Sequence, residues 1–268
     1  MNYTNQLNKV KTFKTVQIEI IDKIAVLKFN RPEQLNAMNR QMMDEIIEAI
    51  HLINGNSDTT VAVIIGEGRA FMAGADIKEY GSQTQEEFGS FQEKGKQLYE
   101  SIEKASKPWI AAINGFALGG GFEIALSCDM IVASQHAKMG LPEVFLSLIP
   151  GGGGTQRLIQ KIGINRVKEM LFFGAQYDTK TLHEWGVVNR IFSDDNFMSQ
   201  VLDFVGKLSR RPQSSIAELK RLANLSLTSM AFEERIEDEA KTVKQLFLRS
   251  EAKRAIQKFI KKSENDGK

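Results

Sequence analysis

The sequence predicts an α/β core followed by a helical C-terminal tail. Over the first two thirds of the chain, short apolar runs rich in β-branched residues alternate with loops and helical stripes, as in α/β proteins. Beyond Gly154 the apolar residues follow an almost purely helical spacing. The apolar faces of that tail need partners, either the core or a second subunit.

The N-terminal elements follow from residue type and spacing. Residues 1–14 are polar and basic and predict a loose arm. Residues 16–20 and 24–29 are rich in β-branched residues around an Asp22–Lys23 turn, which predicts a hairpin. Asn39 is expected to cap a helix that runs to about Asn54. Its apolar stripe consists of Met42, Met43, Ile46, Ile47, Ile50 and Ile53.

The central third alternates strands with loops and helices. Residues 61–65 are a short apolar run typical of a buried parallel strand, and a loop is expected over 66–75. A helix is expected at about 86–105, and a second buried strand at 109–113. Residues 114–121 form a glycine-rich turn into a helix at about 120–128. A third buried strand is expected at 130–133.

The last third predicts helices. Thr179 is expected to be an N-cap, Pro212 to separate two helices, and residues 231–248 to form an amphipathic helix. The expected organisation is an arm at 1–14, an α/β core with the active site at 15–200, and a helical region at 201–268.

Composition excludes several classes. The 268 residues carry 35 basic and 33 acidic side chains, a net charge of +2 that argues against a general binder of nucleic acid or membrane surfaces. One cysteine, Cys128, rules out internal disulfides, and three histidines leave little for a metal site. The first twenty residues contain no signal-like apolar region, and the longest uncharged stretches, 109–122 and 144–156, are too short to span a membrane. A cytoplasmic protein without membrane contact is expected.

Two glycine clusters, 119–121 and 151–154, stand out. They could be tight turns or close packing points. A dinucleotide-binding turn would need a third glycine at position 124, where the chain has Ile124, and no phosphate-binding P-loop motif is present. Gly120 begins a helix, where unpaired N–H groups favour negative charge, so it suits an oxyanion hole.

Two glutamates, Glu123 and Glu143, lie in uncharged apolar segments next to these clusters. Each could simply cap or salt-bridge locally. Burial could instead raise the pKa of one of them and allow the pair to transfer protons. Their sequence separation alone does not show that they meet in space.

Five motifs in order make the chain resemble the crotonase superfamily, of the enoyl-CoA hydratase type, over about residues 16–262. They are FNRP at 29–32 with LNA at 35–37, AGADIK at 73–78, KP at 107–108 leading to NGFALGGGFE at 114–123, GLPE at 140–143 and IPGGGGTQRL at 149–158. The resemblance implies a spiral of ββα units with a C-terminal helical trimerisation region. It also implies a homo-oligomer, a trimer or a hexamer of two stacked trimers.

The resemblance also implies roles for named residues. The N–H groups of Ala75 and Gly120 would form the oxyanion hole on a thioester carbonyl, and Glu123 and Glu143 would be catalytic. Residues expected to hold the coenzyme A portion or the substrate are Leu35, Asn36, Ala37, Ala73, Asp76, Ile77, Lys78 and Gly119.

The implied reaction is reversible syn addition of water to 2-enoyl-CoA, giving 3-hydroxyacyl-CoA, as in fatty-acid or branched-chain acyl degradation. No cofactor is expected, because coenzyme A is part of the substrate. Another reaction of the superfamily, such as enoyl-CoA isomerisation by a single acid, is the nearest alternative. An RNA-binding or scaffold role is disfavoured, because the first helix has Arg40 against the acids Asp44, Glu45 and Glu48. The basic residues near the C-terminus could be a solvated face or could meet coenzyme A phosphates.

Overall fold

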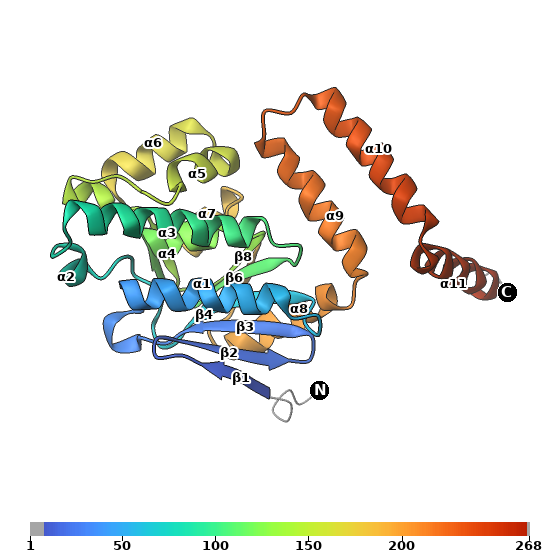
Figure 1. The fold of residues 1–268 in the computed structure, drawn as a ribbon, viewed down its shortest axis with the longest axis horizontal. Helices are drawn as coiled ribbons and strands as arrows, with labels where there is room; N and C mark the ends of the chain where they lie inside the picture. The colour runs from blue at the N-terminus through green and yellow to red at the C-terminus, as the bar shows by residue number, and fades with distance from the viewer. Residues whose placement is uncertain (1–7, 267–268) are drawn as a thin grey trace. The chain divides into compact units, whose positions relative to one another are not determined.

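A computed structural model describes residues 8–266. The chain divides into two compact units, Met1–Arg210 and Arg211–Lys268 (Figure 1). The boundary falls about ten residues later than the sequence indicated, because α8 (Phe197–Ser209) packs into the core of the first unit.

The first unit is built from ββα repeats. The four successive repeats are β2 (Val16–Ile21), β3 (Ile24–Phe29) and α1 (Arg40–Gly55); β4 (Val61–Gly66), β5 (Ala70–Met72) and α3 (Gln85–Glu103); β6 (Trp109–Ile113), β7 (Phe116–Leu118) and α4 (Gly120–Ser127); and β8 (Met130–Ser134), β9 (Lys138–Gly140) and α5 (Gly154–Ile162). The remaining elements are β1 (Asn8–Thr12), η2 (Pro32–Gln34), α2 (Ile77–Tyr80), η3 (Glu143–Leu146), α6 (Ile164–Phe173), β10 (Tyr177–Asp178), α7 (Thr179–Glu184), β11 (Arg190–Phe192) and α8.

The strands form two sheets. The seven-stranded sheet has the order β1-β2-β3-β4-β6-β8-β11, antiparallel from β1 to β3 and parallel from β3 onward. The four-stranded sheet has the order β10-β9-β7-β5, in which β9, β7 and β5 are parallel. From the second repeat on, each ββα unit therefore contributes one strand to each sheet.

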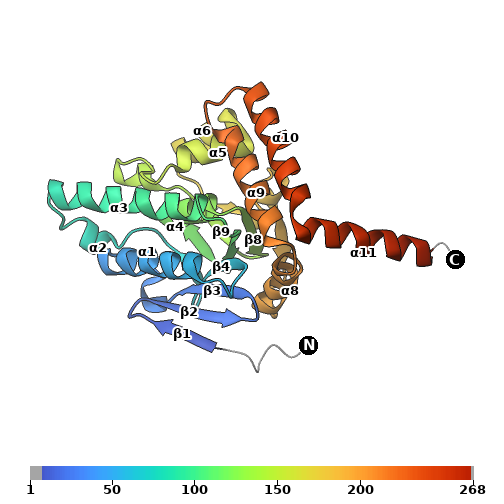
Figure 2. The ribbon, with the colours of Figure 1, turned by 45° about the vertical axis from the view of Figure 1, so that its right-hand side comes forward.

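Both faces of the large sheet are buried, and the sequences of its central strands are therefore continuous apolar runs. Side chains of alternate residues, such as Leu27 and Ile64, face the core that contains α1, α3 and α4. Their neighbours, such as Val26 and Val63, pack with α8 in a second cluster. In both views α1 and α3 lie side by side over the sheet (Figures 1 and 2).

Several expected elements are confirmed. The hairpin turns at Asp22, which has the left-handed φ of 51°. Asn39 caps α1 by accepting the Met42 N–H at 2.9 Å. The stripe of α1 is buried except for Ile47, which is half-buried. Cys128, at the end of α4, is buried and forms no disulfide within the described residues.

Three expectations differ from the structure. Residues 8–12 of the expected loose arm form β1, which pairs with β2, while residues 1–7 lie outside the described residues. The short strands β5 and β7 lie where a loop and a glycine-rich turn were expected, and β9 was not predicted, because three residues are too few to show a strand period. Thr179 is not the cap of α7. Asp178 takes that role, and the buried Thr179 hydroxyl donates to the carbonyls of Ser134 and Ala137.

The second unit consists of α9 (Gln213–Asn224), η4 (Leu225–Leu227), α10 (Phe232–Leu248) and α11 (Ser250–Asp266). Pro212 separates α8 from α9, as expected. Arg221 on α9 joins α10 through Asp238 and Thr242. Within the described residues, no helix has the length and apolar character needed to cross a membrane.

Candidate active site

The ends of three adjacent parallel strands converge on one site. In the small sheet β5, β7 and β9 are neighbours, so the residues that follow them emerge at the same sheet edge. Ala75 follows β5, Gly120 and Glu123 follow β7, and Glu143 follows β9. The small sheet that the sequence did not reveal is therefore what brings the sequence-predicted residues together.

Ala75 and Gly120 belong to the wall of one cavity. Neither donates a backbone hydrogen bond within the described part of the chain, and both residues line the cavity together with Gly74 and Gly119. Gly119 has φ 53°, and a Cβ there would lie 3.0 Å from the Glu143 Oε1. Glycine is required there because only glycine allows the chain to turn into α4 while a carboxylate lies this close.

Glu123 is buried and held by backbone N–H groups. Its side chain is 3% exposed, and the N–H groups of Gly152 and Gly154 both donate to Oε1 at 2.8 Å. Among the described residues no group donates to Oε2. Burial raises the pKa of Glu123, while the two N–H groups and the positive charge of Arg157 oppose that rise. Glu123 thus caps the second glycine cluster and also lines the cavity.

Glu143 lies opposite Glu123 with little support for a negative charge. Its Oε2 is buried and has no hydrogen-bond partner among the described residues. Burial, with a further contribution from the charge of Glu123, raises the pKa of Glu143 to about 7. The two carboxyl groups therefore occupy different environments: Glu123 accepts two N–H groups of the glycine cluster, whereas only the backbone N–H of Glu143 itself opposes the rise in the pKa of Glu143.

The cavity has a volume of about 130 Å³ and is mainly apolar. Several lining residues were not identified as functional from the sequence. Those on α1 and α3 have the spacing of ordinary core residues, and the others lie in short helices or loops that carry no periodic signal. Together these residues are Met38, Met43, Tyr80, Phe91, Gln92, Tyr99, Leu146, Leu148 and Ile149. Met43 was expected to be core and is indeed 1% exposed, so it serves both roles.

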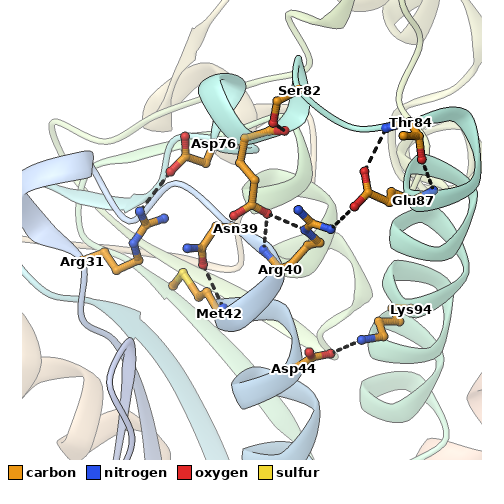
Figure 3. A network of polar contacts seen from close by, with 11 residues as sticks. Arg31, Asn39, Arg40, Met42, Asp44, Asp76, Ser82, Thr84, Glu87 and Lys94 are labelled. Atoms are coloured by element: carbon orange, nitrogen blue, oxygen red, sulfur yellow. Dashed lines mark hydrogen bonds and ion pairs between the residues drawn. The ribbon is translucent and has the colours of Figure 1, made fainter.

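The two segments predicted to hold coenzyme A lie side by side. The Ala73 N–H donates to the Leu35 carbonyl at 3.0 Å, and the Met38 N–H donates to the Gly74 carbonyl at 2.8 Å. Arg31 links the two segments, because its guanidinium Nη2 donates to Asp76 Oδ2 at 2.9 Å (Figure 3). The Arg31 guanidinium also donates to the Ala37 carbonyl.

Within these segments the structure separates cavity residues from supporting ones. Ala73 and Ile77 line the cavity, whereas Lys78 is exposed outside it. The buried Asn36 amide donates to the carbonyls of Glu67 and Ala70 and accepts the Arg31 N–H. Its amide is thereby committed to the protein's own backbone, and Leu35, Ala37 and Asp76 also hold the loops together.

The histidines lie apart from this cavity. His136 pairs with Asp194, and the His183 Nδ1 contacts the Val188 carbonyl at 2.7 Å. No grouping of three or more histidine, cysteine, aspartate or glutamate side chains suited to a metal ion occurs in residues 8–266.

Ala75 and Gly120 follow two adjacent parallel strands and line one cavity with two carboxyl groups, an arrangement suited to an enzyme that polarises a carbonyl group and transfers protons beside it. Residues 19–266 match the family model described as enoyl-CoA hydratase/isomerase. The chain belongs to this family, within the crotonase superfamily, and has the crotonase fold.

Named relatives of this chain are consistent with membership of this family. The chain is 33% identical to the short-chain-enoyl-CoA hydratase of Clostridium acetobutylicum, over 94% of this chain and 97% of that one. It is 35% identical to the crotonyl-CoA hydratase of Syntrophomonas wolfei, over 79% and 82% of the two chains. A crystal structure of an enoyl-CoA hydratase subunit from Geobacillus kaustophilus is 35% identical, with a TM-score of 0.88 over 94% of this chain and 97% of that one.

Proposed function

We propose that the protein is an enoyl-CoA hydratase, a hydro-lyase that adds water across the double bond of a 2-enoyl-CoA. The observation that carries the proposal is the convergence of four groups on one cavity. These are the N–H groups of Ala75 and Gly120 and the carboxyl groups of Glu123 and Glu143.

The two N–H groups serve the thioester. As water attacks C3, negative charge develops on the thioester oxygen and the transition state becomes enolate-like. Donors fixed in advance at that oxygen stabilise it, typically by about 3 kcal/mol for each donor. The apolar walls, including Phe91 and Leu148, strengthen these interactions by excluding water.

The two glutamates divide the proton transfers. The donors on Glu123 Oε1 favour its carboxylate, which leaves Oε2 to accept a proton from the attacking water. Glu143, whose pKa is about 7, holds a proton in much of the population at neutral pH and delivers it to C2. With both groups beside one water, hydrogen and hydroxyl add to the same face of the substrate.

The substrate is an acyl-CoA thioester. The segments 35–37 and 73–78 support its coenzyme A portion, with Ala73 and Ile77 at the cavity and Leu35, Asn36, Ala37 and Asp76 shaping the loops. Lys78 is exposed where it can meet a phosphate. The proposed chemistry uses no separate cofactor, and degradation of fatty acids or branched acyl chains is the setting that this reaction suits.

Hydration is tested directly by a panel of 2-enoyl-CoA esters of increasing length and branching. Loss of absorbance from the conjugated thioester, with formation of 3-hydroxyacyl-CoA by mass spectrometry, is expected. Isomerisation is the alternative, and a 3-enoyl-CoA substrate distinguishes it. Conversion of 3-enoyl to 2-enoyl ester without water uptake would replace hydration by isomerisation.

We also propose a homo-oligomer, a trimer or a hexamer, that works in the cytoplasm. Large apolar side chains are exposed in each unit taken separately, including Phe145 and Phe172 in the first and Phe247 and Phe259 in the second. Such faces are normally covered by other subunits. The buried Cys128, a thiol outside any disulfide, suits a reducing compartment.

A further inference from the structure

Arg157 lies behind the glycine loop (residues 151–154) that binds Glu123. It belongs to the first turn of α5, and its guanidinium donates to the Gly152 carbonyl. The same guanidinium donates through Nε to Glu103 Oε1 at 2.6 Å, at the end of α3. Arg157 therefore links α5, the glycine loop and α3 at one point.

The glycine loop is held from two sides. On the cavity side, its Gly152 and Gly154 N–H groups bind Glu123. On the other side, Arg157 binds the carbonyl of Gly152, so one residue of the loop contacts both groups. A Cβ at Gly152 would lie 2.3 Å from the Tyr99 ring, which shows how closely the loop is packed.

The arginine is also enclosed. Its side chain is 19% exposed, and the guanidinium lies 5.5 Å from the centre of the buried Tyr99 ring. Glu103 and the aromatic face together offset the desolvation of this cation. These partners outweigh the desolvation and raise the pKa of Arg157, so the cation is stably held beside the glycine loop.

The ionisable groups around Glu123 are few. Tyr99 approaches from α3, Glu143 from η3, and Arg157 from α5, while Tyr80 lies across the cavity. Of these, Arg157 alone is a cation, and its positive charge opposes the rise in the pKa of Glu123. Glu103 faces Arg157 from the far side.

We infer that Arg157, braced by Glu103, is a positioning residue that holds the glycine loop around Glu123 and favours the carboxylate form of that residue. The inference rests on the proposed function, because it assigns Glu123 the role of a base. Arg157 does not contact the substrate in this role. It fixes the donors on Oε1 and so directs Oε2 toward the attacking water.

The test compares Arg157→Gln and Arg157→Lys with Lys94→Gln, a control that removes a cation from the exposed Lys94–Asp44 ion pair. In Arg157→Gln, kcat is expected to fall about 10- to 100-fold, with KM changing less than about threefold. The acid limb of the kcat/KM profile is expected to move up by about one pH unit, since a nearby positive charge is lost. In Arg157→Lys the acid limb should return to its wild-type pH, because the positive charge is kept. The full kcat should not return, because lysine lacks the several N–H donors of a guanidinium group.

Glu103→Gln tests whether the ion pair between Glu103 and Arg157 holds the arginine in place. If Glu103 acts through Arg157, the double variant Arg157→Gln/Glu103→Gln should be no slower than Arg157→Gln alone. Fully additive losses would contradict that coupling. If Arg157→Gln does not fold, Arg157→Lys and Glu103→Gln still carry the comparison, since the first keeps the charge and the second keeps the arginine.

Infrared titration measures the protonation of Glu123 directly, without any enzymatic turnover. The carboxylic acid band that disappears in Glu123→Gln should form at higher pH in Arg157→Gln than in the wild type. An unchanged titration together with an unchanged acid limb would overturn the inference, even in an active hydratase. Wild-type protein that fails to hydrate any enoyl-CoA would overturn the proposed function instead, while the titration would still report on Arg157.

Discussion

Glu123 and Glu143 line the same cavity, and the charge of Glu123 adds to burial in raising the pKa of Glu143 to about 7. They lie twenty positions apart in the sequence. They meet because β7 and β9 are neighbouring parallel strands whose ends open on one edge. The shared cavity that would place both carboxyl groups beside one water in the proposed reaction therefore also couples the pKa of Glu143 to the charge of Glu123.

Replacing either glutamate by glutamine should abolish most of the turnover. Glu123→Gln removes the proton acceptor and Glu143→Gln the proton donor, so each should lower kcat by about 10²-fold or more. Glu184→Gln, at an exposed ion pair on α7, is the matched control and should keep its activity. Circular dichroism checks folding. A hydration rate near that of the wild type in either variant would remove that residue from the mechanism.

The rate should fall as pH rises through about 7, because Glu143 must carry a proton and its pKa is raised to about 7. It should fall again at acid pH as Glu123 gains a proton. Because the carboxyl groups interact, both limbs of the kcat/KM profile belong to the pair. In Glu123→Gln, loss of the neighbouring charge should move the alkaline limb of the residual activity to lower pH. An alkaline limb that does not respond would show that Glu123 has no effect on the titration of Glu143.

Gly120 offers a test of the oxyanion hole with a built-in control. Gly120→Pro removes the N–H, so thioester turnover should collapse while free coenzyme A, which has no thioester carbonyl, still binds in calorimetry. Gly120→Ala keeps the N–H and has room, since its Cβ would be 3.6 Å from Met38 Cε and from the Tyr99 hydroxyl. It should retain folding and most of its turnover. Equal loss of binding and turnover in a folded proline variant would assign Gly120 a structural role.

The sequence predicted long elements well and the small sheet not at all. The apolar stripe of α1 and the cap at Asn39 are local signals that tertiary structure did not override. Strands β5, β7 and β9 have three residues each, and their pairing joins segments far apart in the chain. Their existence depends on long-range contacts that no local pattern records.

The same limit applies to the site. The motifs identified Glu123, Glu143, Ala75 and Gly120 by resemblance, and the structure brings all four to one cavity. Arg157 was visible only as part of a motif, because its role depends on Glu103 in another helix. The Asn36 amide looked available for a ligand, but its partners, the carbonyls of Glu67 and Ala70, are distant in sequence.

Assembly gives the last prediction, and it concerns the second unit. Its helices expose large apolar side chains, including Val243 and Phe247 one turn apart on α10, which are 60% and 59% exposed. Ile256, Phe259 and Ile260 form a similar stripe on α11. Water-exposed stripes of this kind cost free energy unless another surface covers them. Full-length protein should therefore be a trimer or hexamer by light scattering.

Deletion of residues 231–268 should give monomers or insoluble protein without activity, although both glutamates are retained. Phe247→Asp makes the sharper test, because a charge buried at an interface is strongly unfavourable. Lys244→Asp, at an exposed polar position of the same helix, is its control and should leave the assembly intact. A monomer of 30.1 kDa with full hydratase activity would contradict the assembly and leave the catalytic proposal untouched, because its four groups all belong to the first unit.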